Sequence, residues 1–261
     1  MLTHALLVAS LLLGDVAVPQ PKVVKATPPA ADGGVATDGG VKKAEPPPMA
    51  PEVKALVDRV QAFYEKTDDF TADFRQDYTY KAFKRTQTSS GKVTYKRPAL
   101  MRWEYEKPSP RTFVLAGERV LALDPEAKLL TVAAIATSKL SASVTFLWGQ
   151  GKLAEEFSIA QTPCAKCAGT VLELTPLHPD GRFKKVLLEV DPKTAQVIKS
   201  TVVDPDGSEN AVAFTNLKTN VGITADKFKI YPPPGTQIQD FTQRGAGPVA
   251  PGQPAADAGT P

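Results

Sequence analysis

The chain has few of the side chains that carry out catalysis. Histidine occurs only at His4 and His178, and a lone loop histidine is far more often solvated than a general base. No nucleophile elbow, phosphate-binding loop or four-ligand zinc spacing is present. The net charge of +3 is too small to indicate nucleic acid, which requires a clustered basic stripe. The sequence therefore predicts neither an enzyme nor a nucleic-acid-binding protein, and no cofactor or metal.

Proline is unevenly spread, and its distribution divides the chain. Residues 18–51 are rich in Pro, Ala and Gly and have no aromatic residue, so they are predicted to be a disordered linker. Residues 243–261 are predicted to be a disordered tail for the same reason, which leaves one domain over residues 52–242. The apolar run within residues 1–17 is typical of a secretory signal. It favours export and cleavage; the alternative is a non-cleaved anchor, although the run is short of the roughly 20 residues that span a bilayer.

Cysteine is also scarce. The only two cysteines form a C-x-x-C pattern at Cys164 and Cys167, just before a predicted strand at Val171–Thr175. A thioredoxin-like motif would instead begin a helix in a βαβ unit, and two cysteines cannot complete a zinc site. In an exported chain we expect a local disulfide at a hairpin tip, with free thiols as the alternative.

What the chain does have is a long stretch of alternating residues at 91–113. Apolar and polar side chains alternate with the period of two that indicates half-buried strands, the apolar set being Val93, Tyr95, Met101, Trp103 and Tyr105. Pro98 cannot donate within a central strand, so two strands are predicted, joined at residues 97–99. Arg97 has the parity of the apolar set, and an inward guanidinium must find hydrogen-bond partners.

Two segments on either side have helical spacing. Pro51 suits a first helical position, and the following apolar residues form one face of a predicted helix. Residues 133–149, which are flanked by strands, are predicted to form a marginal apolar helix. This helix is either a movable lid or a fixed plug at the end of a barrel. Regularly spaced turns elsewhere, and a meander of final strands over residues 184–217, predict an antiparallel barrel or half-barrel.

The stretch KRPALMRWEYEKP resembles the central motif of the LolA family of periplasmic lipoprotein carriers. The matching residues are Arg97, Pro98, Trp103 and Pro108, with weaker matches in the right order at residues 70–76, 117–125 and 226–235. The resemblance implies an α+β fold that is mainly β. Its curved antiparallel sheet would form an incomplete barrel covered by a helical lid. It also implies a periplasmic carrier whose apolar cavity takes lipoprotein acyl chains and ferries them from the inner to the outer membrane.

The same resemblance assigns partners and site residues. The partners are an ATP-driven inner-membrane lipoprotein-releasing complex and an outer-membrane receptor, and the carrier is expected to be a monomer. The matching arginine of the family is tied to the lid, so Arg97 is expected to act as a latch on the lid carbonyls; the alternative is a structural arginine satisfied within the sheet. Parity and helical spacing, together with the family's acyl site, place these residues around the cavity: Phe74, Val93, Tyr95, Met101, Trp103, Tyr105, Phe113 and Leu115 from the sheet, and Leu140, Val144 and Leu147 from the lid.

Two other functions remain open at this point. The chain could bind a related lipid or glycolipid in the periplasm. It could also be an envelope regulator of similar fold that senses mislocalised lipoproteins.

Overall fold

The computed structural model describes residues 48–134, 152–178 and 181–242. Their centre is a single sheet of twelve strands in the order β12-β6-β5-β4-β3-β2-β1-β11-β10-β9-β8-β7. The strands are β1 (Asp69–Tyr80), β2 (Arg85–Lys96), β3 (Leu100–Lys107), β4 (Arg111–Ala116), β5 (Arg119–Asp124), β6 (Leu129–Ala134), β7 (Phe157–Thr162), β8 (Thr170–Pro176), β9 (Lys185–Val190), β10 (Val197–Val203), β11 (Glu209–Thr219) and β12 (Gln237–Asp240). The helices are α2 (Pro51–Glu65), the short α4 (Leu153–Glu156) and the 3-10 helix η3 (Ala225–Phe228).

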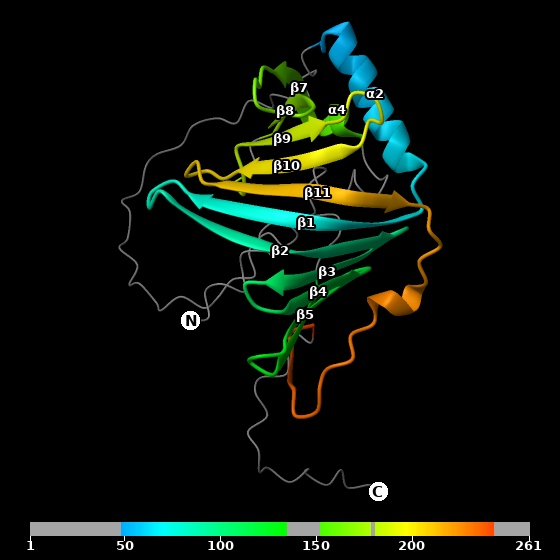
Figure 1. Ribbon diagram of the computed structural model, residues 1–261, viewed down its shortest axis with the longest axis vertical. Helices are drawn as coiled ribbons and strands as arrows, with labels where there is room; N and C mark the ends of the chain where they lie inside the picture. The colour runs from blue at the N-terminus through cyan, green and yellow to red at the C-terminus, as the bar shows by residue number, and fades with distance from the viewer. Residues whose placement is uncertain (1–47, 135–151, 179–180, 243–261) are drawn as a thin grey trace, which may run out of the picture.

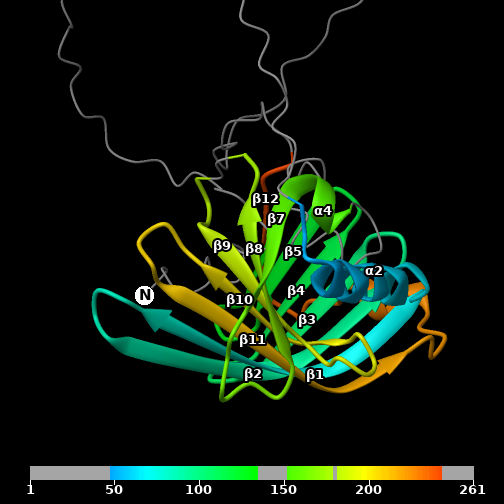
Figure 2. The ribbon, with the colours of Figure 1, turned by 90° about the horizontal axis from the view of Figure 1, so that it is seen from above.

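The sheet is strongly curved and does not close on itself. Figure 1 shows its strands stacked along the long axis, and Figure 2 shows α2 and α4 on the concave side. All neighbouring strands pair antiparallel except β12, which runs parallel to β6. The predicted mainly β fold, an open curved sheet in the form of an incomplete barrel, is confirmed; the parallel edge strand β12 departs from the antiparallel prediction.

The corner predicted at residues 97–99 is present. Strand β2 ends at Lys96 and β3 begins at Leu100, so the Arg97–Ala99 turn joins them. A bulge between Ser90 and Gly91 bends the pairing of β2 with β3. Gly91 is needed there, because a Cβ atom would lie 1.9 Å from the carbonyl oxygen of Glu104. The bulge and this close approach help to curve the sheet.

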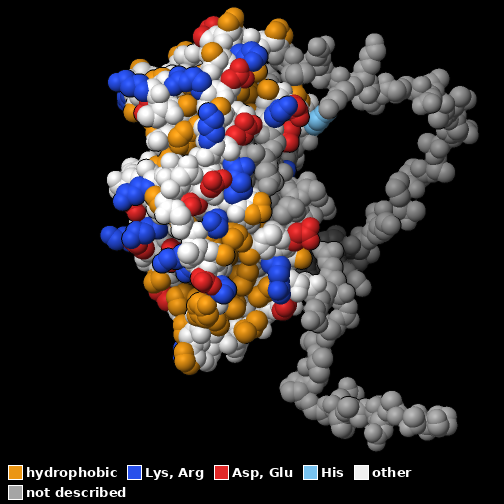
Figure 3. All heavy atoms as spheres, turned by 90° about the vertical axis from the view of Figure 1, so that its right-hand side faces the viewer, with side chains coloured by type: hydrophobic (Ala, Val, Ile, Leu, Met, Phe, Trp, Pro, Cys, Tyr) orange, Lys and Arg blue, Asp and Glu red, His pale blue; other side chains and the backbone are white. Residues whose placement is uncertain are grey.

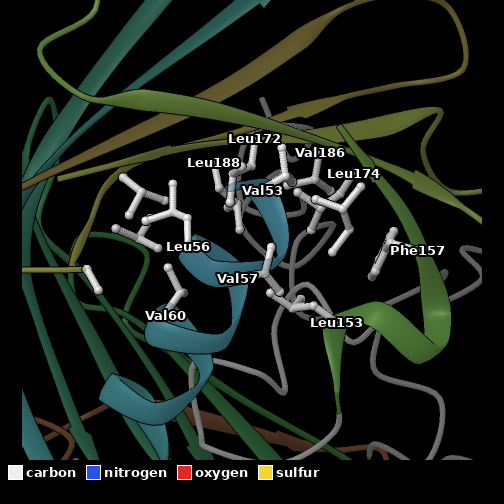
Figure 4. Packing of buried hydrophobic residues seen from close by; sticks show 14 of the residues in the cluster. Val53, Leu56, Val57, Val60, Leu153, Phe157, Leu172, Leu174, Val186 and Leu188 are labelled. Carbon is white, nitrogen blue, oxygen red and sulfur yellow. The ribbon is translucent and has the colours of Figure 1, made fainter. Parts of the chain in front are cut away.

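Helix α2 covers one half of the concave side. Its apolar face is the one predicted from the sequence, and Val53, Leu56, Val57, Val60 and Tyr64 are buried. They pack on apolar side chains of the neighbouring strands and on α4, as Figure 4 shows; the labelled partners are Leu153, Phe157, Leu172, Leu174, Val186 and Leu188. We call this cluster the helix-covered core.

A second contact fixes α2 from its outer side. The guanidinium of Arg59 donates to the carbonyl oxygens of Pro192 (2.8 Å) and Lys193 (2.7 Å) in the β9–β10 turn. Since α2 is held both by its buried face and by this clamp, it forms one unit with strands β7–β10.

The predicted lid segment is only partly described. Ala133 and Ala134 are the last residues of β6, so the segment does not begin as a helix at residue 133. Residues 135–149, and with them the predicted lid residues Leu140, Val144 and Leu147, lie outside the described residues. The predicted signal at 1–17, most of the linker at 18–51 and the tail at 243–261 lie outside them too.

Candidate functional site

The other half of the concave side is lined by a second buried cluster, which we call the aromatic face. It comes from strands β1 to β5 and β11, and no described helix contributes to it. Its buried members are Phe70, Ala72, Phe74, Val93, Tyr95, Met101, Tyr105, Phe113, Leu115, Val120 and Val212, with the half-buried Trp103, Ala122, Phe214 and Leu217 packed against them.

Every sheet residue that the sequence selected for a cavity belongs to this aromatic face. Strand alternation alone brings them together, since cross-strand pairs such as Trp103↔Phe113 and Met101↔Leu115 place side chains of equal parity side by side. Sequence reasoning omitted Val212 and Phe214 of β11. Nothing local predicts that β11 pairs with β1, but the alternation within residues 209–217 was a signal for them.

Aromatic rings in edge-to-face contact make up the middle of this face. The Phe74 ring lies 4.8 Å from that of Trp103 and 4.9 Å from that of Tyr105, measured between centroids. Such contacts contribute roughly 0.5–1.5 kcal/mol beyond the area that they bury. The buried indole Nε1 of Trp103 has no hydrogen-bond partner among the described residues. A partnerless donor on an otherwise apolar surface can donate to an oxygen of a ligand.

A buried polar network borders the aromatic face on the side toward the β1–β2 turn. The hydroxyl of Tyr105 donates to Oε1 of Gln76 (2.9 Å), and Nε2 of Gln76 donates to Oδ1 of Asn210 (2.8 Å). Burial raises the pKa of Tyr105, so its hydroxyl stays protonated and serves as a donor. Sequence reasoning passed over Gln76, which shares the parity of Phe74, because a polar residue in an apolar series gives no clue to its distant partners.

Arg97 lies at the opposite end of the face, beside the end of α2. Its Nη2 atom donates to the carbonyl oxygens of Tyr64 (3.0 Å), Glu65 (2.7 Å) and Thr67 (3.1 Å). The last carbonyls of a helix lack partners within the helix, and a cation there also complements the helix dipole. These described acceptors do not test the predicted contact with the lid carbonyls, which stays a prediction. They belong to α2 and the turn after it rather than to residues 133–149, most of which lie outside the described residues.

A buried carboxylate completes this end of the site. Asp69 accepts hydrogen bonds from the backbone N–H groups of Val221 (2.7 Å), Gly222 (3.0 Å) and Ile223 (3.0 Å). It therefore fixes the chain that leaves β11 against the start of β1. Sequence reasoning did not single out Asp69, since its partners lie about 150 residues away.

The disulfide is remote from this site. Cys164 and Cys167 are joined, with their Cα atoms 5.5 Å apart, in the connection between β7 and β8. Within the described ranges no group of His, Cys, Asp and Glu side chains is suited to hold a metal ion. In the same ranges, no helix is both long and apolar enough to cross a membrane.

These features define a class of protein: a single open sheet whose concave side carries an aliphatic core under a helix and, beside it, an aromatic face. The profile of the family described as outer membrane lipoprotein carrier protein LolA matches residues 65–231. The chain belongs to this family.

Individual relatives have the same name. The chain is 28% identical over 182 residues to an outer-membrane lipoprotein carrier protein of Dechloromonas aromatica, covering 70% of this chain and 86% of that protein. Among solved structures, an uncharacterized conserved protein from Thermus thermophilus has a TM-score of 0.47 at 14% identity, over 72% of this chain and 98% of that one. A chain of the Pseudomonas aeruginosa MucA/MucB complex has a TM-score of 0.42 at 15% identity, over 69% of this chain and 61% of that one.

Proposed function

We propose that this protein is a periplasmic carrier that binds the acyl chains of lipoproteins on its aromatic face and moves them from the inner to the outer membrane. One observation carries the proposal: the sheet residues selected for a cavity all fall on one apolar face that no described helix covers. Family membership supports the lipoprotein cargo and the periplasmic location.

The chemistry of the face suits an acyl chain with a polar end. Aromatic and aliphatic side chains shelter methylene groups, each worth about 0.8 kcal/mol when removed from water. The buried indole N–H of Trp103, which has no partner among the described residues, supports a role as donor to an ester or amide carbonyl of an acyl group that opens this face. Several fully sheltered chains would be held by tens of kcal/mol, so a carrier that releases its cargo must shelter them incompletely.

Arg97 supplies a means of release. We propose that it is a latch that ties the β2–β3 corner to the end of α2 in the empty protein. If loading separates the two, the lost hydrogen bonds oppose binding and favour release. The partners by family analogy are an ATP-driven inner-membrane complex and an outer-membrane receptor, and the protein acts as a monomer without cofactor or catalysis.

A fluorescent acyl probe tests the proposal. The full chain, stripped of lipid, should bind the probe, and a synthetic triacylated lipopeptide should displace the bound probe. Trp103→Glu places a charge on the aromatic face and should abolish binding. Tyr231→Glu is the matched control, because Tyr231 is an aromatic residue that is 77% exposed in the connection from β11 to β12.

Both variants must keep the circular dichroism spectrum of the wild type. If folded Trp103→Glu bound the probe as well as the Tyr231→Glu control, the aromatic face would not be the acyl site. The mass of material that solvent extracts from protein purified out of its native envelope then identifies the cargo. If the extract contained a glycolipid and no acylated peptide, the cargo would be a glycolipid and not a lipoprotein.

A further inference from the structure

The β1–β2 hairpin ends in an exposed aromatic side chain among cations. Phe83 is 80% exposed, and Lys81, Lys84 and Arg85 around it are exposed as well. The turn contains no acidic residue. Among the described residues, none of the ion pairs involves these three cations. A single exposed apolar side chain is common on protein surfaces, but one surrounded by solvated cations suits a partner that is both apolar and anionic.

The tip also projects beyond its neighbours. The pairing of β1 with β2 continues to Tyr80↔Arg85, whereas β3 follows β2 only as far as Ser90. In Figures 1 and 2 the hairpin reaches farther to the left than the adjoining strands, away from the end of α2. Of the described residues, those at the tip would therefore be the first to touch a flat surface that approaches from that side.

A line of aromatic rings connects the tip with the inner surface of the sheet. Tyr78 and Tyr80 share the parity of Phe74, and their ring centroids lie 4.5 Å apart. The ring of Phe83 is 6.4 Å from that of Tyr80. The hydroxyl of Tyr78 donates to Oδ2 of Asp204 at 2.6 Å, which holds this line against the β10–β11 turn.

We propose that this tip docks the protein on an anionic phospholipid bilayer. Phe83 enters the interface between headgroups and acyl chains, and Lys84 and Arg85 contact lipid phosphates. An exposed aromatic residue with basic neighbours suits this boundary, because the ring buries apolar area while the long cationic side chains reach the headgroups. Figure 3 shows the side of the molecule away from the tip, where cations and carboxylates are interspersed, whereas the charged residues of the hairpin turn itself, Lys81 to Arg85, are all cations.

The neighbouring β10–β11 turn determines which of the three cations can contact lipid phosphates. That turn carries Asp204 and Asp206, and the side chain of Lys81 lies against its Gly207, with Cδ 2.9 Å from where a Cβ atom would be. The charge of Lys81 is therefore directed at the acidic turn. Lys84 and Arg85 follow Phe83 and are left to meet the membrane.

The inference goes beyond the proposed function, since it concerns the surface on which the protein lands and not its cargo. Sedimentation of the full chain with vesicles tests it without any acyl probe, so the two can fail separately. Wild-type protein should bind vesicles that contain phosphatidylglycerol, bind vesicles of pure phosphatidylcholine far more weakly, and dissociate as salt is raised.

Two variants with matched controls locate the contact. Phe83→Ser should weaken binding by roughly fivefold through lost apolar burial, whereas Tyr231→Ser, at an equally exposed aromatic residue, should not. Reversing both charges with Lys84→Glu and Arg85→Glu should weaken it by about 25-fold or more, at roughly fivefold per basic residue near the surface. The control with the same net charge change reverses Lys193, which is exposed, and Lys66, exposed at the end of α2.

A depth measurement separates insertion from loose adsorption. In Phe83→Trp the emission of the new indole should shift to the blue on vesicles and be quenched by lipids brominated near the headgroup. Wild-type protein, whose emission comes from Trp103 and Trp148, provides the background that is subtracted. Unaltered emission of the new indole, binding of Phe83→Ser equal to its control, or equal binding to both kinds of vesicle would overturn the proposal. Wild-type binding seen only when an envelope protein is present in the vesicles would assign the tip to a protein partner and also overturn it.

Discussion

Replacing Arg97 by leucine perturbs stability and binding through the same hydrogen bonds. Nη2 of Arg97 has two protons to share among the carbonyl oxygens of Tyr64, Glu65 and Thr67, so two hydrogen bonds at most are lost. Each would contribute about 1.5–3 kcal/mol from a charged donor. The side chain is 32% exposed and water can replace part of this, which leaves about 1–3 kcal/mol in total.

If Arg97 is a latch, the free energy of its hydrogen bonds should contribute both to the stability of the empty protein and to its affinity for an acyl probe. In the empty protein, Arg97→Leu should lower the melting temperature by about 2–4 °C for each kcal/mol lost. If loading breaks these bonds, the variant no longer loses them on binding. Its affinity for an acyl probe should then rise by roughly 5- to 150-fold, and transfer to an acceptor should slow. Calorimetric melting and probe titration of lipid-free protein measure the two effects.

Arg59→Leu is the matched control. Arg59 likewise donates to backbone carbonyls, those of Pro192 and Lys193, but they lie in the β9–β10 turn, which contributes no residue to the aromatic face. It should lower the melting temperature without changing probe affinity. If Arg97→Leu behaved in the same way, with lower stability and unaltered affinity, Arg97 would be a structural tie in both states and the latch would be refuted.

Two smaller changes test the surroundings of the site. Gln76→Leu leaves the buried hydroxyl of Tyr105 without its acceptor and should lower the free energy of unfolding by about 1–3 kcal/mol in urea titrations, while wild-type stability would contradict the network. At Asp77, burial raises the pKa, but hydrogen bonds from Thr88 and Arg75 outweigh it, so the pKa lies below the usual 3.8. A lowered carboxyl pKa stabilises the fold above the unfolded value and loses that contribution as the pH falls through the folded value. Asp77→Asn should therefore have a lower melting temperature than wild type at pH 7, and this difference should disappear as the pH falls below 3.8. A difference in melting temperature that is undiminished at low pH would be evidence against this coupling.

The helix and the aromatic face could be predicted because their signals are local. Pro51 and the apolar spacing after it determine where α2 begins and which side it buries. The alternation on either side of Pro98 predicts both strands and the corner between them. Each of these inferences depends on residues within a few turns or strand steps, where sidedness follows directly from backbone geometry.

The contacts that join distant segments could not be predicted in this way. The acceptors of Arg97 lie about 30 residues upstream, and they reach it only because β1 and β2 pair over their full length. The carboxylate of Asp69 is satisfied by backbone N–H groups after β11, whose pairing with β1 has no local signature. Polar groups in buried positions depend on such long-range partners, so their roles emerge only from the sheet order.

The two halves of the concave side differ in how firmly they are held. The helix-covered core is mostly Val and Leu locked beneath α2, and the Arg59 clamp fixes that helix from outside. The aromatic face includes half-buried rings such as Trp103 and Phe214, and its described members come from the sheet alone. A carrier needs both properties, because the part that gives way to a ligand must not be the part that keeps the chain folded. Arg97 links the two halves at about 1–3 kcal/mol, which is small against the buried core yet large enough to shift a binding equilibrium. The division places the stability of the fold under α2 and leaves the aromatic face free to exchange its own contacts for those of a ligand.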